Sequence, residues 1–417
     1  MSEIAALHPV IRTWLFEGPL SSHVSAYVAR LRRGRYAPST VGHCLNGMAH
    51  FSHWMVQCSL PAQLLDDGWV DEFMQHHLPR CDCPGEAMRT PKSVHAALTA
   101  LLEVLRECGV ITELPKPTGP IVDELRNYDT SMRDARGLAE GTRRSYLRII
   151  GRLLLFKFAD RPVILCELEP EDVRRFIASQ MEKLDSISNA TTIAATLRAY
   201  LRYRATCGDA VQPLLAAIGS TAHWSLASLP RALKADEVDR LMSSFTATPN
   251  SQRRGYAIVR LALDLGLRSI EISRLQVADI DWRMGTVTLK RTKSHQQDVL
   301  PLPVETGQAL EAYIRHERPQ TSSGAVFVRH QAPHDKPLGV DGIRAVVRDA
   351  FVRAGIPHGR SHSLRHTLAC RIVNQGGSIK EVAGVLRHRS LDTSLIYAKL
   401  DHGALAGVAL AWPGSAQ

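Results

Sequence analysis

The sequence predicts a mainly α fold, in which tandem helical domains precede a mixed, mostly helical domain with a small antiparallel β-sheet. Apolar residues recur at helical spacing in both halves of the chain, and one stretch, residues 286–302, alternates as strand, turn and strand. A chain of 417 residues is long enough for two or three domains with separate cores. We predict their bounds at 1–115, 116–220 and 221–417.

Composition limits the class of protein. A net charge of +10 and a pI of about 9.3 favour a polyanionic partner such as DNA or RNA, although basic proteins of other kinds share them. No apolar run approaches the ~18 residues of a membrane span, so we expect no membrane partner. Eight cysteines without disulfide-like spacing indicate reduced thiols, and no signal peptide is recognised, so we expect a cytoplasmic protein.

Two segments of the first half resemble copies of one plan. Residues 37–55 align with 139–157 without a gap, and both show one apolar helix face. The matched positions are Leu45, Met48, Phe51 and Trp54 in the first segment and Leu147, Ile150, Leu153 and Phe156 in the second. Residues 69–75 likewise resemble 172–178. The pattern favours two small helical domains in tandem, and the alternative is that amphipathic helices resemble one another.

The second copy is rich in arginine. Its candidate DNA-binding residues are Arg143, Arg144, Arg148 and Arg152. Basic side chains on a helix can neutralise phosphates and give a salt-dependent affinity for DNA. The alternative is a charged face that only meets solvent.

Soft metal ligands lie close together in the first copy: His76, His77, Cys81 and Cys83. Zinc sites usually contain C-x₂₋₄-C pairs, whereas this segment has C-x-C and no second pair follows. The sequence therefore favours a loop with incidental thiols over a zinc site, and we assign no metal ligand.

Residues 219–231 are small, polar and contain proline, which indicates a linker before the last domain. In the segment that follows, Gly266 can end one helix and Ser269 can begin the next. Arg268 lies at this junction, where a side chain can point into a cleft, and Glu271 follows it by three residues.

The hairpin comprises strands at 286–290 and 298–302, with a turn at Lys293-Ser294. Charged residues at a hairpin tip are common in any protein. By itself, this pattern predicts structure and leaves function open.

Residues 361–400 are predicted to begin with a helix whose apolar positions are Leu364, Leu368, Ile372 and Val373. Gly376-Gly377 would end this helix, and Ser378 would cap a second one. Ser390 or Thr393 can begin a third helix that carries Tyr397. Packing does not require the polar residues of this stretch, which are His362, Arg365, His388 and Tyr397. Each alone has an ordinary structural explanation. Together they form an ordered set: H-x-x-R-H, then L-R-H-R-S, then a tyrosine nine residues beyond His388.

This set resembles the second conserved box of the tyrosine recombinases, the phage integrase family. Residues 266–275, GLRSIEISRL, are similar to the first box of that family. The resemblance covers roughly 255–400 strongly and 120–215 loosely. One departure is visible, because the family usually has glycine before the second-box histidine and this chain has Arg387.

The resemblance implies six catalytic residues, which are Arg268, Lys293, His362, Arg365, His388 and Tyr397. Tyr397 would attack a DNA phosphodiester and form a 3′-phosphotyrosyl link, while the two arginines hold the phosphate. Lys293, or else Lys290 or Arg291, would protonate the leaving oxygen. His362 would assist proton transfer, His388 would donate a hydrogen bond to the phosphate, and Glu271 would orient the site. No cofactor or metal is expected.

The leading interpretation is a site-specific recombinase that acts on double-stranded DNA for integration, excision or transposition of a mobile element. The alternatives are a DNA-binding regulator without catalysis and a type IB topoisomerase. The family resemblance also implies a homo-oligomer, a tetrameric synapse on DNA, in which the apolar tail 405–412 docks on a neighbouring subunit.

Overall fold

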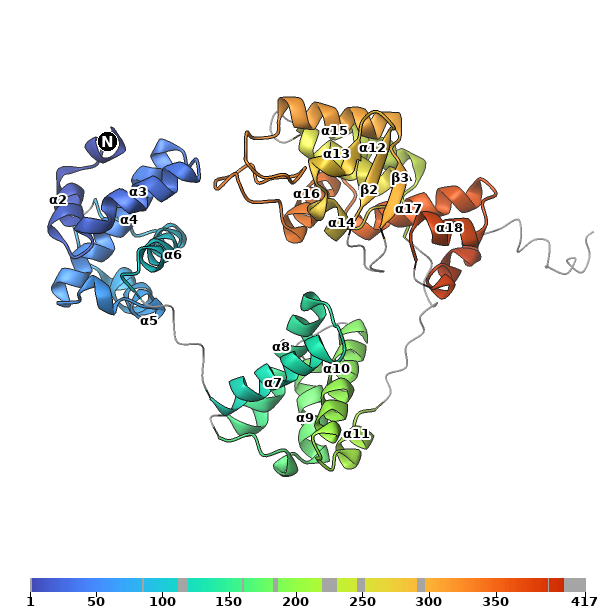
Figure 1. Cartoon of the computed structure of the whole chain (residues 1–417), viewed down its shortest axis with the longest axis horizontal. Coiled ribbons are helices and arrows are strands. Elements are labelled where there is room, and N and C mark those ends of the chain that lie inside the picture. Colours follow the sequence, from blue (N-terminus) through green and yellow to red (C-terminus); the bar gives the residue numbers. More distant parts are fainter. Residues whose placement is uncertain are drawn as a thin grey trace, which may run out of the picture. The chain divides into compact units, whose positions relative to one another are not determined.

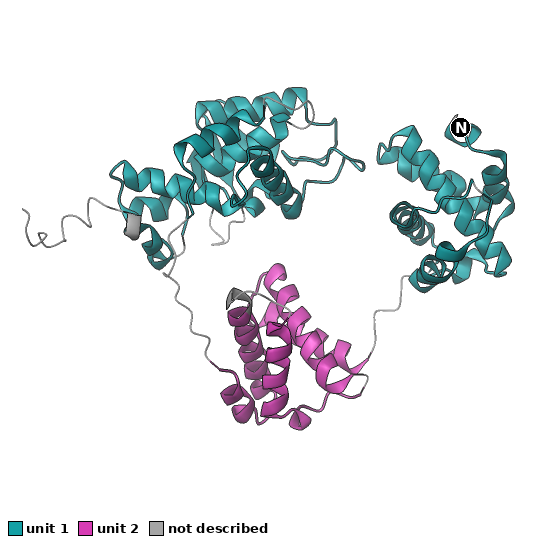
Figure 2. Cartoon of the chain, turned by 180° about the vertical axis from the view of Figure 1, so that it is seen from behind, with its two compact units in different colours: residues 1–112, 228–417 teal, residues 113–227 magenta. Residues whose placement is uncertain are grey.

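The computed structural model describes residues 2–84, 86–111, 119–159, 161–182, 187–219, 231–245, 252–290, 297–388 and 390–400. The chain divides into two compact units, Met1–Thr112 with Ser228–Gln417 and Glu113–Ala227 (Figure 2). Within the described ranges, every helix is too short or too polar to cross a lipid bilayer. The predicted linker lies almost wholly outside the described residues, and the three-domain division stays a prediction.

Residues 2–111 form a helical bundle with a core of its own. Its α-helices are α1 (Ser2–Ala5), α2 (Pro9–Glu17), α3 (Val24–Arg33), α4 (Pro38–Gln57), α5 (Asp67–Glu72) and α6 (Pro91–Glu107). Short helical turns lie between them at Ser21–His23, Ala62–Leu64 and Leu78–Arg80, and a π-helix, η3, spans Phe73–His77. The long helices α4 and α6 pack against each other (Figure 1).

The unit 113–227 is also helical. It contains α7 (Pro120–Asp134), α8 (Glu140–Phe158), a 3₁₀ turn at Leu165–Glu167, α9 (Pro170–Met181), α10 (Ile187–Thr206) and α11 (Gln212–Ala217). A buried carboxylate joins the first and fourth of these helices. Glu124 on α7 accepts hydrogen bonds from the Tyr200 hydroxyl at 2.8 Å and from Arg204 Nη1 at 2.9 Å, both on α10.

The C-terminal part is built around α13 (Gln252–Asp264), which packs against the long helices α15 (Val304–His316), α16 (Val340–Arg353) and α17 (Ser361–Asn374) (Figure 1). The remaining helices are α12 (Ala235–Ser243), α14 (Ser269–Arg274) and α18 (Ile379–Val385), with 3₁₀ turns at Val277–Asp279, Leu391–Thr393 (η7) and Leu395–Leu400 (η8). The sheet has the order β1-β2-β3 and contains β1 (Ile280–Asp281), β2 (Thr286–Leu289) and β3 (Asp298–Pro301).

The mainly α fold with a small antiparallel sheet is confirmed. Strands β2 and β3 form the predicted antiparallel hairpin, with Leu289 opposite Asp298, and β1 is an addition that the sequence pattern did not predict. Ser378 caps α18 as expected, because its side chain accepts a hydrogen bond from the Glu381 backbone. The third helix expected near Tyr397 is wrong in type: the segment forms the two 3₁₀ turns η7 and η8.

Replacing Glu124 by alanine should destabilise the unit 113–227 by about 3 kcal/mol, because the change leaves the buried Tyr200 hydroxyl without its acceptor and leaves Arg204 with Asp209 as its remaining carboxylate partner. Hydrogen exchange with mass spectrometry can measure this for peptides of α7 and α10 separately from the rest of the chain. Glu140→Ala is the matched control, since its carboxylate is exposed and should contribute less than about 1 kcal/mol. Equal effects of the two changes would contradict the role of Glu124.

Candidate active site

A basic cleft of about 380 Å³ opens beside the start of α14 and the start of α17. The charged and titratable side chains that line it are Arg268, Arg344, Arg348, Arg360, His362 and Arg365. No carboxylate is among its lining residues in the described part of the chain. Such a surface favours an anion with several oxygens, such as a phosphate.

Arg365 connects two distant parts of the sequence at the floor of this cleft. It lies on α17, is 6% exposed, and donates hydrogen bonds to the carbonyl oxygens of Gly266 and Leu386. Burial lowers the pKa of Arg365 to about 9, with Arg268 and Arg387 adding repulsion, so the guanidinium is still charged at pH 7. The first and second predicted boxes therefore meet at one cation.

Gly266 permits this close approach. Its φ is +59°, and a Cβ atom there would lie 2.8 Å from Leu386 Cδ2 and 3.0 Å from Leu368 Cδ2. Only glycine meets both the backbone and the packing requirement at this position.

Arg268 is the residue that precedes α14, and Glu271 holds it in place. One carboxylate oxygen of Glu271 accepts the Arg268 backbone N–H at 2.8 Å, and the other accepts Arg268 Nη1 at 2.7 Å. Burial raises the pKa of Glu271, but Arg387 and Arg268 outweigh that effect and hold this pKa below its usual value. The carboxylate is therefore charged, and it fixes the orientation of Arg268 at the cleft.

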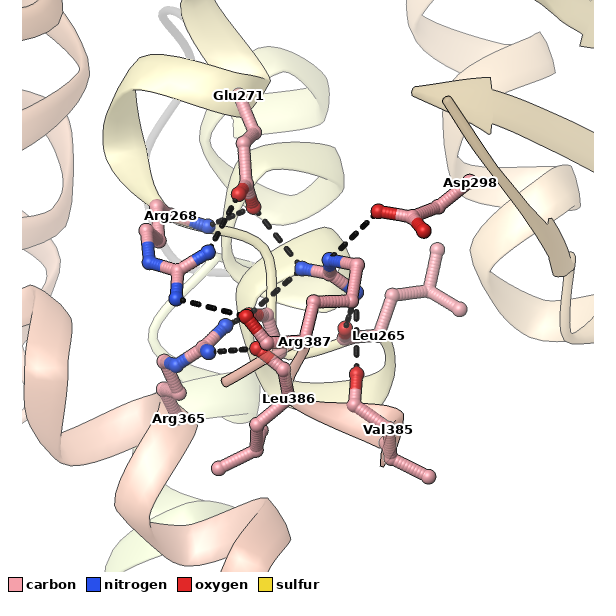
Figure 3. A network of polar contacts seen from close by, with 9 residues as sticks. Leu265, Arg268, Glu271, Asp298, Arg365, Val385, Leu386 and Arg387 are labelled. Carbon is pink, nitrogen blue, oxygen red and sulfur yellow. Dashed lines mark hydrogen bonds and ion pairs between the residues drawn. The ribbon is translucent and has the colours of Figure 1, made fainter. Parts of the chain in front are cut away.

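Arg387 has two unusual properties. Its φ is +53°, in the left-handed region that favours glycine, and its side chain is only 5% exposed. Arg387 Nη2 lies 2.9 Å from Glu271 Oε2, and its Nε lies 4.0 Å from Asp298 Oδ2 on β3. Figure 3 shows this side chain between the two carboxylates. Arg387 thus connects the first box, the second box and the hairpin.

Tyr397 is buried and bonded to a histidine that the sequence analysis did not assign. Its hydroxyl lies 2.7 Å from His366 Nδ1, and its ring is 2% exposed. It packs in a small core with Ala369, Cys370, Val373, Val382 and Leu386. Burial raises the pKa of Tyr397 to about 12. The partner of the hydroxyl is thus His366, the second histidine of H-x-x-R-H, and proton transfer between His362 and Tyr397 stays a prediction.

The two histidines assigned from sequence lie beside the arginines. Desolvation in the cleft, followed by the charges of Arg365, Arg344 and Arg268, lowers the pKa of His362. Burial, followed by the charges of Arg365 and Arg268, lowers the pKa of His388 to about 4, and its Nδ1 lies 2.6 Å from Ser394 Oγ. Both imidazoles are therefore neutral at pH 7.

Lys293 and its alternative Arg291 lie outside the described residues. The other alternative, Lys290, follows β2 and forms an ion pair of 2.6 Å with Asp279. Its side chain is otherwise exposed. Strands β2 and β3 therefore flank the segment that contains Lys293, and Asp298 is the first residue of β3.

The four arginines predicted to bind DNA lie on α8 with different partners. Arg143 is mostly covered and pairs with Asp129 of α7 at 2.9 Å, so it joins two helices. Arg144, Arg148 and Arg152 are exposed and recur every four residues, which places them on one face of the helix. Arg144 pairs with Glu140 on the same helix.

The cysteine-containing segment has a different arrangement from the one that the sequence suggested. His76 is exposed and lies 3.7 Å from Glu72. His77, Cys81 and Cys83 gather instead around His50 of α4. No spacing pattern in the sequence connects His50 to them.

Residues 231–403 match the phage integrase family. The chain is 33% identical over 408 residues to an integrase/recombinase of Sinorhizobium fredii, a match that covers 96% of each chain. It is 27% identical to the tyrosine recombinase XerC of Stutzerimonas stutzeri, over 69% of this chain and 94% of that one. Its fold is similar to that of XerH site-specific recombinase bound to palindromic difH substrate, with a TM-score of 0.52, 17% identity, and coverage of 72% of this chain and 98% of that one.

We expect Arg387→Gly to destabilise the region around α14 and α18 by about 2 kcal/mol. The change relieves about 1 kcal/mol of left-handed backbone strain, but it leaves the buried Glu271 carboxylate with one arginine instead of two. Hydrogen exchange of the α14 and α18 peptides measures the effect.

A double-mutant cycle with Glu271→Gln supplies the control for this prediction. The two changes should be non-additive, with a coupling of about 1–3 kcal/mol, because each removes one partner of the same ion pair. Additive effects would show that Arg387 and Glu271 do not depend on each other.

Proposed function

The chain belongs to the phage integrase family of tyrosine recombinases, and on that premise we propose that it cuts and rejoins DNA strands at a specific site through Tyr397. The observation that carries the proposal is the meeting of Arg268 and Arg365 in one basic cleft, although 97 positions separate them in the sequence. A phosphodiester gathers negative charge in its transition state, and two fixed guanidinium groups can stabilise it.

Tyr397 would supply the nucleophile. Its oxygen attacks the phosphorus, the bond to the 5′-oxygen breaks, and a 3′-phosphotyrosyl link forms while the 5′-hydroxyl leaves. The phosphotyrosyl ester retains the bond energy of the phosphodiester that was cut, so the reverse reaction can join a new strand without ATP. The phenolic proton needs an acceptor, and neutral His366 already lies within hydrogen-bond distance of the hydroxyl.

The attack requires Tyr397 to leave its buried position. Its hydroxyl has a pKa of about 12 in this state, and its ring lies in the small core beside α17 and α18. The residue sits on the short 3₁₀ turn η8, whose release exposes the ring without unfolding a long helix. We therefore propose that the free chain holds the nucleophile in a protected state and that DNA binding and assembly release it.

The remaining assigned residues would complete the reaction. Lys293, carried by the hairpin, would protonate the leaving 5′-oxygen. His388 and His362 are neutral beside the arginines, so each can donate a hydrogen bond to the phosphate or pass a proton. Glu271 would keep Arg268 oriented and would not itself transfer a proton.

Double-stranded DNA is the proposed substrate, and the chain would act as a homo-oligomer. The solved XerH structure was determined on a palindromic substrate, which supports binding of two copies across one site. Exchange of strands between two sites then calls for a tetrameric synapse. The tail 405–412, proposed to dock on a neighbouring subunit, lies outside the described residues. Integration, excision or transposition of a mobile element is the proposed biological role.

Tyr397→Phe should abolish a covalent protein–DNA adduct that the wild-type chain forms. A binding site can be selected from random duplexes and then nicked near its centre, so that cleavage releases a short strand and traps the adduct on a denaturing gel. Tyr256→Phe is the matched control, because it removes a phenolic hydroxyl from the same domain outside the cleft, and it should keep the adduct. If the wild type shifts DNA on a native gel but forms no adduct, a DNA-binding regulator explains the chain better.

Arg148→Ala should lower the salt dependence of DNA binding. Each phosphate contact contributes about −0.9 to the slope of log K against log salt, so the variant should lose about one unit of slope. Arg143→Ala is the control, since Asp129 already neutralises that side chain and it should change the slope less. Fluorescence anisotropy over a salt series measures both, and an unchanged slope for Arg148→Ala would place the DNA elsewhere.

A further inference from the structure

Four soft metal ligands converge in the N-terminal helical part, far in sequence from the catalytic residues. They are His50 on α4, His77 at the end of the π-helix η3, and Cys81 and Cys83 in the loop that follows. Their ligand atoms all lie within 4.8 Å of one another. His50 and Cys83 are buried, and His77 and Cys81 are partly covered.

Two of the six separations between the ligand atoms match a tetrahedral zinc centre. His77 Nε2 lies 3.4 Å from His50 Nε2 and 3.6 Å from Cys83 Sγ. With Zn–N bonds of about 2.0–2.1 Å and Zn–S bonds of about 2.3 Å, tetrahedral geometry places two nitrogens about 3.3 Å apart and a nitrogen and a sulfur about 3.6 Å apart. These two pairs need little movement to accept the ion, and every other pair of ligand atoms starts within 4.8 Å.

The tautomer of His50 is also the one that binding of a metal ion through Nε2 requires. Its Nδ1 lies 2.9 Å from the carbonyl oxygen of Met88, which can only accept a hydrogen bond. Nδ1 therefore carries the proton, and Nε2, which lies 3.4 Å from His77 Nε2, keeps its lone pair for a metal ion. A backbone carbonyl on the second nitrogen is a common way in which proteins orient a metal-binding histidine.

The surrounding residues fix the loop and the rings. Asn46 of α4 donates to the carbonyl of Glu86 and accepts from the backbone of Met88, both at 2.9 Å. Arg89 donates to the carbonyl of Cys83. Phe73 stacks on the His77 ring with centroids 5.1 Å apart. The site is thus held from two sides before any ion enters.

We propose that His50, His77, Cys81 and Cys83 bind one zinc ion as a closed structural site. Two thiolates and two imidazoles suit zinc, and four protein ligands leave no open position for catalysis. The ion would fasten the loop 78–90 to α4 and so stabilise the N-terminal part. The sequence pattern favoured incidental thiols. In the structure, His50 takes the place of His76 in the ligand set, and it lies 27 positions upstream of His77.

Metal analysis of the purified full-length chain tests the proposal. Elemental mass spectrometry should find about one zinc per chain in the wild type, in Cys58→Ser and in His76→Ala. Cys83→Ser and His50→Ala should bring the zinc content down to background. Removal of the ion by a chelator should lower the melting temperature of the wild type and accelerate hydrogen exchange in α4 and the loop.

A second measurement keeps the test decisive if the variants fold poorly. Wild-type chain freed of metal should bind Co²⁺ with the visible bands of tetrahedral cobalt and a thiolate charge-transfer band, and one equivalent of Zn²⁺ should remove both. A wild type that carries no metal and shows no cobalt bands would overturn the site and leave a hydrogen-bonded group of histidines and thiols. Equal zinc in wild type and Cys83→Ser, or another metal in place of zinc, would also overturn it.

Discussion

The buried guanidinium of Arg365 is the interaction on which the rest of the candidate site depends. It joins the carbonyl of Gly266, at the end of α13, to the carbonyl of Leu386, at the end of α18. A cation with 6% exposure is stable only where such acceptors surround it. The same two contacts bring Arg268, His388 and the core that holds Tyr397 to one place. Folding of the second box onto the first therefore builds the basic cleft.

Charge balance around this cation follows from the same constraint. Three arginines, Arg268, Arg365 and Arg387, lie near one buried carboxylate, that of Glu271, with Asp298 at the edge. Positive charge exceeds negative charge, which is the arrangement that a bound phosphate would complete. Arg387 extends this group to β3, next to the segment that contains Lys293. A single side chain therefore lies between the hairpin and the first box.

Several parts of this arrangement could be predicted from the sequence. The stop at Gly266, the cap at Ser378 and the alternation of the hairpin are local signals, and each reflects a backbone or packing requirement. Other parts depend on tertiary contacts that no spacing encodes. The partner of Tyr397 is His366 because the turn η8 folds back on α17, and His50 joins the cysteines because a loop returns to α4. The family pattern likewise marked Arg387 only as a departure, and its ion pair became visible in the fold.

The most direct test of the account identifies the residue that carries DNA after cleavage. Wild-type chain would be trapped on a nicked site, digested with protease and nuclease, and examined by tandem mass spectrometry. We predict one modified peptide, with a nucleotide phosphate on Tyr397, and its loss when Arg365 is replaced by alanine. A nucleotide on any other tyrosine, or an adduct that persists without Arg365, would contradict the account.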